Sequence, residues 1–281
     1  MKAFNIVLSL LPFASAIKLL VPLYVYPLEG AWDSLFAAVE GHSTTTFQIV
    51  INPSSGPGSS KLPPQDYVKA ISQLRAYPNV ELIGYVRVSW AARDRSEVLN
   101  EIDTYAAWAD YEDASLDMDG IFFDEAPSIL DDDAVSYMDI VSTYAASAIG
   151  SRRTVARLQP LNMTTSSVSG VTSIFNMGTA PETTKYYDTG AKVVVMEWAY
   201  ADYTANKLSE SVPSTYASQS SVILHDFYGD IAALADFFDA SLNLSLDSVS
   251  VTADCCYNTL GAVNGAAGIK VTAEVFSDVV A

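Results

Sequence analysis

Basic residues are scarce in this 281-residue sequence, where 15 Lys and Arg stand against 33 Asp and Glu. The formal net charge of −18 at pH 7 argues against nucleic acid as a partner, because binding to phosphates depends on clusters of Lys and Arg. An acidic surface of this kind keeps a protein soluble outside the cell. It would also attract a cationic polymer, such as a partly deacetylated amino-sugar chain.

Histidine is rarer still, with only His42 and His225 in the chain. Neither Gly-x-Ser-x-Gly nor His-Glu-x-x-His occurs, so the sequence predicts no nucleophilic triad, no metal site and no cofactor. The acid triplet at 131–133 lacks the glycine and distal glutamate of a calcium loop, and we interpret it as the solvated start of a helix. His225, beside Asp226, is expected at a strand end, as a structural residue or a substrate contact.

The two cysteines are neighbours, Cys255 and Cys256, so no long loop can be cross-linked within one chain and a disulfide framework is excluded. The sequence leaves three states open for them: a strained vicinal ring, two thiols, or pairing between chains. A vicinal ring would present a small apolar plate at the edge of a site.

Long apolar runs are absent after the first residues, so we expect no transmembrane anchor and no membrane partner. Residues 1–16 begin with Met-Lys, continue through a short apolar segment and end in Ala-Ser-Ala. This pattern is typical of a secretory signal peptide and predicts a mature chain that starts near Ile17. The sequons at Asn162 and Asn243 agree with a secreted or cell-wall location and predict N-glycans there. A monomer is expected.

Half of the residues are hydrophobic, which suffices for one large core, and we expect a single domain over 17–281. Apolar runs that suit buried parallel strands alternate with segments of helical spacing, one of which includes Phe227 and Phe238. We count eight such strands, at 19–27, 46–51, 80–88, 120–125, 172–176, 192–197, 221–225 and 248–252. This order predicts the α/β class and a single (β/α)₈ TIM-type barrel.

Two features leave room for another arrangement. An open doubly wound sheet is the alternative fold, but no Gly-x-Gly-x-x-Gly follows the first strand. Residues 153–158 could form a ninth strand. We interpret the whole segment 151–172 as an insertion, because eight strands already complete a barrel.

The apolar run that begins at Gly120 ends in two adjacent carboxylates, Asp124 and Glu125, and Glu197 ends a later run in the same way. Catalytic groups of such barrels lie at the carboxyl ends of the strands, so these three acids are expected at one mouth. Glycosidic cleavage needs one carboxylic acid and one carboxylate that attacks or activates water. We predict Asp124 and Glu197 as this pair and Glu125 as a third, supporting carboxylate, since neighbours on a strand face opposite ways.

Aromatic side chains gather at the same strand ends, where they can pack against the apolar CH faces of sugar rings. The group comprises Tyr26, Tyr85, Trp90, Trp198, Tyr200, Tyr203, Tyr228 and Tyr257. Polar side chains beside them would hydrogen-bond the sugar hydroxyls. The predicted substrate-binding residues are Tyr26, Asn52, Tyr85, Trp90, Asn176, Trp198, Tyr200, His225 and Tyr228.

Several motifs extend over nearly the whole mature chain: Pro-Leu-Tyr-Val-Tyr-Pro at 22–27, Ile-Asn-Pro-Ser-Ser-Gly-Pro-Gly at 51–58, Gly-Tyr-Val at 84–86, Gly-Ile-Phe-Phe-Asp-Glu-Ala-Pro at 120–127 and Val-Val-Met-Glu at 194–197. In these motifs the sequence resembles the spherulin-4-like, or spherulation-specific, family of secreted fungal and slime-mould proteins. It departs from the family at Asn176-Met177-Gly178, where Asn-Pro-Gly is usual, and in the length of 151–172.

The resemblance implies a (β/α)₈ glycoside hydrolase that cuts α-1,4-linked N-acetylgalactosamine stretches of galactosaminogalactan, and it carries the family's acids over to Asp124, Glu125 and Glu197. A polysaccharide is therefore the expected partner of the site. The competing hypothesis is a non-catalytic carbohydrate-binding or wall-associated structural protein, which would keep the aromatic rim without needing the acids. A small-molecule or polyester hydrolase is a third alternative, but no activated nucleophile is visible.

Overall fold

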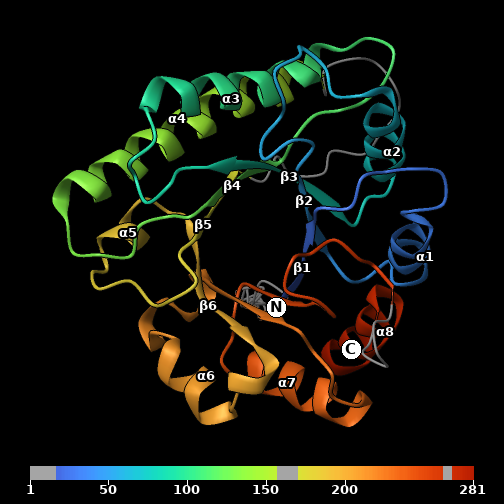
Figure 1. The fold of residues 1–281 in the computed structure, drawn as a ribbon, viewed down its shortest axis with the longest axis vertical. Helices are drawn as coiled ribbons and strands as arrows, with labels where there is room; N and C mark the ends of the chain where they lie inside the picture. The colour runs from blue at the N-terminus through green and yellow to red at the C-terminus, as the bar shows by residue number, and fades with distance from the viewer. Residues whose placement is uncertain (1–16, 157–169, 262–267) are drawn as a thin grey trace, which may run out of the picture.

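Eight parallel strands form a closed barrel in chain order, and a helical connection joins each strand to the next (Figure 1). The computed structural model describes residues 17–156, 170–261 and 268–281. The strands are β1 (Lys18–Leu23), β2 (Phe47–Ile51), β3 (Val80–Arg87), β4 (Gly120–Asp124), β5 (Thr172–Asn176), β6 (Lys192–Ala199), β7 (Ser220–His225) and β8 (Ser248–Val251). The predicted (β/α)₈ barrel is confirmed.

Alternation along the strands divides the core into two layers. The residues between the inward positions, such as Leu82 and Phe123, pack beneath the helices. Burying one side chain of this size contributes about 1.5–3 kcal/mol, so both layers resist a slip in strand register. The inward layer is buried inside the barrel and includes Leu20, Val50, Ile83, Phe122, Ile174, Val194 and Ile223.

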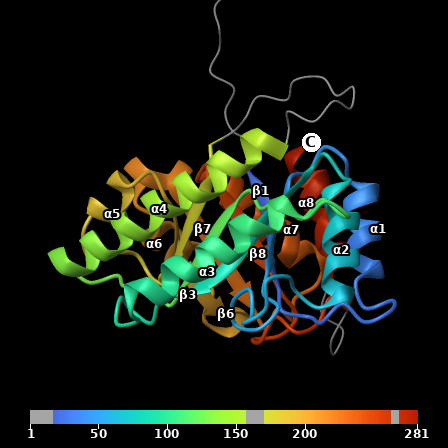
Figure 2. The same ribbon diagram turned by 90° about the horizontal axis from the view of Figure 1, so that it is seen from above.

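Helices cover the outside of the barrel, and each turns an apolar face to it. In α2, for example, Tyr67, Ile71 and Leu74 recur at helical spacing and are buried. Figure 2 shows α3 and α4 running alongside each other across one side of the barrel. The helices are α1 (Asp33–Gly41), α2 (Gln65–Arg75), α3 (Arg95–Ala107), α4 (Asp132–Ala156), α5 (Lys185–Asp188), α6 (Ala205–Ser211), α7 (Ile231–Asn243) and α8 (Ile269–Val280).

The acid triplet stands at the start of α4, as predicted. Asp131 Oδ1 accepts hydrogen bonds from the backbone N–H groups of Asp133 and Ala134, at 2.8 and 3.0 Å. These contacts satisfy donors that have no partner within the helix, and the acidic charge suits the positive end of the helix dipole.

Glycine is required where β4 meets its neighbour. A Cβ atom on Gly120 would fall well inside van der Waals contact of the Thr172 carbonyl oxygen on β5. Backbone cannot move aside as a flexible side chain can, so the strand that carries Asp124 depends on glycine at its first position.

Three boundaries differ from the predicted ones. β1 ends at Leu23, because the Tyr24 N–H turns away to the carbonyl of Tyr257. Residues 153–156 continue α4 and form no strand, while 157–169 lie outside the described residues. Phe227 precedes α7, because Asp230 caps that helix by accepting from the Ala233 N–H at 2.9 Å.

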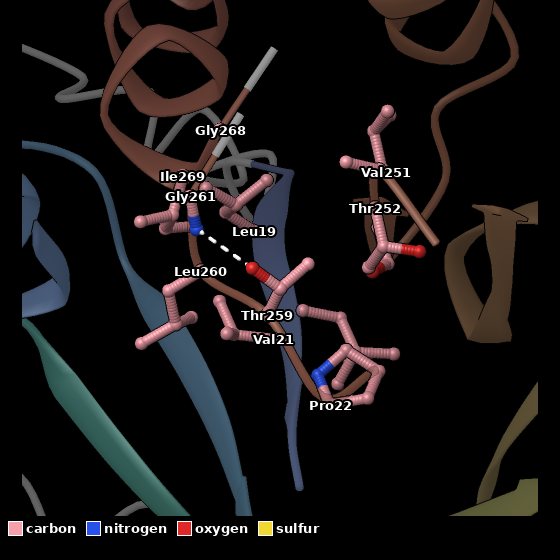
Figure 3. A pocket seen from close by; sticks show the side chains of 13 residues that line it. Leu19, Val21, Pro22, Val251, Thr252, Thr259, Leu260, Gly261, Gly268 and Ile269 are labelled. Carbon is pink, nitrogen blue, oxygen red and sulfur yellow. Dashed lines mark hydrogen bonds between the residues drawn. The ribbon is translucent and has the colours of Figure 1, made fainter. Parts of the chain in front are cut away.

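The seam of the barrel lies between β1 and β8, which pair at Lys18 with Ser248 and at Leu19 with Val249. Beyond these residues a small cavity of about 20 Å³ lies between the strands and the start of α8 (Figure 3). That volume suffices for one water molecule and no more. Pro22 lines it, at a point of β1 where a missing N–H costs no bond to β8.

Candidate active site

Asp124 closes β4 and faces the inside of the barrel, two residues after the inward Phe122. Its Oδ2 accepts a hydrogen bond from the Tyr85 hydroxyl on β3 at 2.7 Å. Its Oδ1 accepts from the side-chain amide of Asn176 on β5 at 2.8 Å. The two neighbouring strands therefore fix both carboxylate oxygens.

Glu197 faces the same space because β6 carries an irregularity. The register of β6 with β7 shifts between Val194 and Met196, and both Val195 and Met196 are buried in the outer layer. Simple alternation from the inward Val194 would turn Met196 inward and Glu197 outward. The bulge reverses that assignment and directs the carboxylate into the mouth.

Two donors hold the Glu197 carboxylate. The Tyr257 hydroxyl donates a short hydrogen bond to Oε1, and the Asn176 amide donates to Oε2 at 2.8 Å. The backbone supports this position as well, since the Glu197 N–H donates to the Gly178 carbonyl at 3.1 Å. Gly178 has φ +66°, a left-handed conformation that suits glycine in the turn after β5.

Asn176 thus bridges Asp124 and Glu197 through one nitrogen atom. Because each hydrogen bond is 2.8 Å long, Asp124 Oδ1 and Glu197 Oε2 cannot lie further apart than twice that distance, 5.6 Å. Asn176 is only 7% exposed, and its Oδ1 is buried without a hydrogen-bond partner in the described part of the chain. An orphaned polar atom costs stability, so the asparagine is placed for the two acids at the expense of the fold.

Glu125 does not belong to this bridged pair. Its backbone is left-handed, with φ +53°, so the strand has ended and the alternation of β4 no longer applies. The carboxylate lies 3.9 Å from the Arg87 guanidinium at the end of β3, and the side chain is 29% exposed. Of the two adjacent acids, Asp124 is the one joined to Glu197.

Three tyrosine rings form the wall beneath the acids. Tyr24 meets Tyr85 and Tyr257 edge to face, with ring centroids 5.5 Å apart in each pair. Burial, followed by the charge of Asp124, raises the pKa of Tyr85, and burial followed by the charge of Glu197 raises the pKa of Tyr257. Both hydroxyls therefore remain protonated donors throughout the physiological range.

Sequence reasoning missed Tyr24 altogether and treated Tyr257 only as a rim platform. Tyr24 had a signal, because it follows Leu20 at even spacing and continues the inward face of β1. Tyr257 had none, since it lies in a loop with a left-handed backbone, φ +55°.

Some predicted substrate-binding residues spend their polar groups on the protein itself. Asn52 Oδ1 accepts from the Gly56 N–H at 3.0 Å within the loop after β2. The Tyr26 hydroxyl donates to Asp66 Oδ2 at 3.3 Å. His225 Nδ1 lies 2.9 Å from Asp226 Oδ2, which places the histidine at the strand end, as expected. Asparagine and histidine here shape the loops around the mouth.

The remaining aromatic residues form a second group on the far side of the mouth. Tyr200 stacks on Tyr203 with ring centroids 6.3 Å apart and meets Tyr228 edge to face at 4.8 Å. Lys207 Nζ lies 5.8 Å above the Trp198 ring. Tyr228 is well exposed. Trp90 stands apart, exposed, in the loop after β3.

The cysteines are exposed thiols, with Sγ atoms 2.9 Å apart, immediately before Tyr257. The hydrogen bond with Cys256 and the surrounding acidic charge raise the pKa of the Cys255 thiol. Of the three states that the sequence left open, the structure describes the thiol pair.

Among the described residues, no group of three or more His, Cys, Asp and Glu could hold a metal ion. No helix in that part of the chain is long and apolar enough to cross a membrane. Asn243 is exposed at the end of α7, opposite the mouth, whereas Asn162 and residues 1–16 lie outside the described ranges.

Comparison with known proteins supports this architecture. Aspergillus clavatus Sph3, whose crystal structure contains GalNAc, matches with a TM-score of 0.73 and 30% identity over 95% of this chain and 98% of Sph3. Thermotoga maritima Cel5A in complex with mannotriose matches with a TM-score of 0.50 and 10% identity, over 94% of this chain and 98% of that one. The second likeness shows the fold alone, which is that of glycoside hydrolases.

Sequence comparison defines the family. Spherulin-4 of Physarum polycephalum is 33% identical over 254 residues, which cover 87% of this chain and 67% of that protein. A family model described as spherulation-specific family 4 matches residues 18–264. The chain therefore belongs to spherulation-specific family 4.

Proposed function

We propose that the protein is a glycoside hydrolase in which Asp124 and Glu197 perform the acid/base and nucleophilic steps. The observation that carries this proposal is the Asn176 amide, which binds both carboxylates at 2.8 Å. Two acids held side by side at the carboxyl ends of barrel strands are what glycosidic cleavage requires. A purely structural site would gain nothing from bringing two negative charges together.

The substrate that fits best is a polysaccharide with α-1,4-linked N-acetylgalactosamine or galactosamine units, cut within the chain. The likeness to Sph3, which binds GalNAc, supports an amino sugar at the site. Aromatic side chains lie in several βα loops around the mouth, which suits a polymer that extends beyond one sugar ring. The net charge of −18 favours a chain that carries some free amino groups.

The spacing of the acids favours retention of anomeric configuration. Retaining glycosidases hold their two carboxyl groups about 5–5.5 Å apart, whereas inverting ones need about 6.5–9.5 Å to admit water. The limit of 5.6 Å between Asp124 Oδ1 and Glu197 Oε2 matches the first class. One acid would then attack the anomeric carbon, and the other would protonate the leaving oxygen and later activate water.

A carbohydrate-binding protein without catalysis is the second candidate, favoured by the exposed aromatic rim. Release of reducing ends from the polymer separates the two functions. We expect the wild type to release oligosaccharides, and Asp124→Asn and Glu197→Gln to lose at least about 10³-fold in kcat/KM. Glu112→Gln, an exposed carboxylate between α3 and β4, is the matched control. Binding without release, unchanged in the two variants, would establish the non-catalytic function.

We further propose that the protein is secreted as a monomer after removal of residues 1–16 and that it carries a glycan at Asn243. The position of Asn243 opposite the mouth leaves the site clear. N-terminal sequencing of the extracellular protein should begin near Ile17, and a chain that retains Met1 would contradict the proposal.

A further inference from the structure

The loop after β3 contains three consecutive non-glycine residues in the left-handed conformation. Ser89, Trp90 and Ala91 have φ values of +48°, +54° and +65°. This conformation brings the Cβ atom against the carbonyl oxygen, so L-residues adopt it singly and rarely. Three in succession require a surrounding structure that enforces them, and such strain is typical of functional sites.

Hydrogen bonds attach this turn to the backbone of the two adjacent acids. The Val88 N–H donates to the Asp124 carbonyl at 2.9 Å, and the Trp90 N–H donates to the Glu125 carbonyl at 2.6 Å. Glu125 is itself left-handed, with φ +53°. The turn and the end of β4 therefore form one unit, and a shift of either would move the other.

Arginine 93 fixes the other end of the loop. The Arg93 guanidinium donates to the Arg87 carbonyl at 3.0 Å and to the Glu101 carboxylate at 2.5 and 2.9 Å. Its carbonyl accepts from the Tyr137 hydroxyl on α4 at 2.9 Å. The loop is thus held by β4 on one side and by α3 and α4 on the other.

The indole at the tip of this rigid loop is exposed. Trp90 is 66% exposed, whereas Trp32 and Trp108 are fully buried. In the described part of the chain, no aromatic or cationic side chain stacks on the Trp90 ring. Core packing does not explain a strained loop that presents a bare indole to solvent beside the acids.

We propose that Trp90 is the platform on which a hexosamine ring of the polymer packs next to the cleaved bond, and that the strained turn fixes this platform relative to Asp124 and Glu125. The apolar CH face of a pyranose covers an indole well, and the nearby Glu125 carboxylate accepts from its hydroxyl or amino groups. This inference rests on the proposed function. It adds a specificity-determining residue outside the acid pair.

Tryptophan fluorescence of an inactive variant provides a direct test, because sugar that covers an exposed indole shifts its emission to shorter wavelength. Glu197→Gln protein is titrated with α-1,4-linked N-acetylgalactosamine oligosaccharides. We expect a shift that disappears in Glu197→Gln/Trp90→Ala, together with a Kd weakened about tenfold, equivalent to about 1.4 kcal/mol. Trp90→Phe should also lose the shift but keep most of the affinity, because its ring still stacks. Trp198→Phe should keep the shift.

The proposal is overturned if the Trp90→Ala protein retains the emission shift or binds within about twofold of its parent. Equal losses of affinity in Trp90→Ala and Trp90→Phe would also overturn it, because they would show an effect of the loop and not of a stacking ring. Both readouts measure binding by an inactive protein. They remain interpretable if the hydrolysis assay disproves the proposed function.

Discussion

Replacing Asn176 by leucine removes the bridge between Asp124 and Glu197 while nearly conserving side-chain volume. The change deletes the amide that donates to both carboxylates at 2.8 Å. Tyr85 and Tyr257 remain as the single side-chain donors to the two acids. The variant therefore perturbs the geometry of the pair without removing either acid.

The expected loss can be worked from these contacts. A hydrogen bond to a charged group contributes about 1.5–3 kcal/mol. Two carboxylates within 5.6 Å also repel by about 3 kcal/mol at an effective dielectric constant of about 20, and solvent reduces that value because both acids are half-buried. We take about 3 kcal/mol as the loss of transition-state stabilisation, which lowers kcat/KM about 10²-fold.

Stability should respond differently, because the leucine also removes the orphaned Oδ1 atom. That gain, about 1–3 kcal/mol, offsets much of the loss of the two donor contacts, which water can replace at half-buried acids. We expect the free energy of unfolding to change by less than about 2 kcal/mol.

The assays are reducing-end release for kcat/KM and equilibrium urea unfolding for stability. Asn206→Leu, at an exposed position of α6, is the matched control and should change neither quantity. A kcat/KM of Asn176→Leu within about threefold of the wild type would refute the role of the bridge. A parallel collapse of stability and activity would show that Asn176 serves the fold instead.

Three further predictions concern the walls of the site. Tyr257→Phe removes a donor to Glu197 and should lower kcat/KM about tenfold in the hydrolysis assay, whereas an unchanged value would exclude that role. Gly120→Ala should lower the free energy of unfolding in urea by about 3 kcal/mol through the clash with Thr172, whereas Gly41→Ala, which has open space around it, should not destabilise. Because the raised pKa values of Tyr85 and Tyr257 keep protons on the native state, their stabilisation is fully present below about pH 10 and falls as the pH rises above it. Urea unfolding at increasing pH should show this decline, and a steeper decline in the double Phe variant would contradict it.

The barrel could be predicted from the sequence because each strand is an apolar run that both layers of the core bury. The position of Asp124 also follows from such a run, since the two carboxylates mark where burial of β4 ends. Boundaries were predicted less well where local bonds decide them, as at Tyr24, whose N–H goes to the carbonyl of Tyr257.

The orientation of Glu197 could not be read from the sequence. Alternation assigns the inward face to Met196, and only the bulge in β6 turns Glu197 inward. The bonds of Tyr257 are equally hidden, because a loop residue among 16 tyrosines carries no period that indicates its direction. Sequence therefore predicts which acids reach the mouth, while hydrogen bonds between strands decide which acids form the pair.

The most direct test of the acid pair is the anomeric form of the first product, followed by proton NMR during hydrolysis of an α-1,4-linked N-acetylgalactosamine polymer. Acids held within 5.6 Å of each other predict that the α-anomer appears first and then equilibrates to the mixture. The β-anomer as first product would contradict the account, because inversion requires a wider separation than the Asn176 bridge allows.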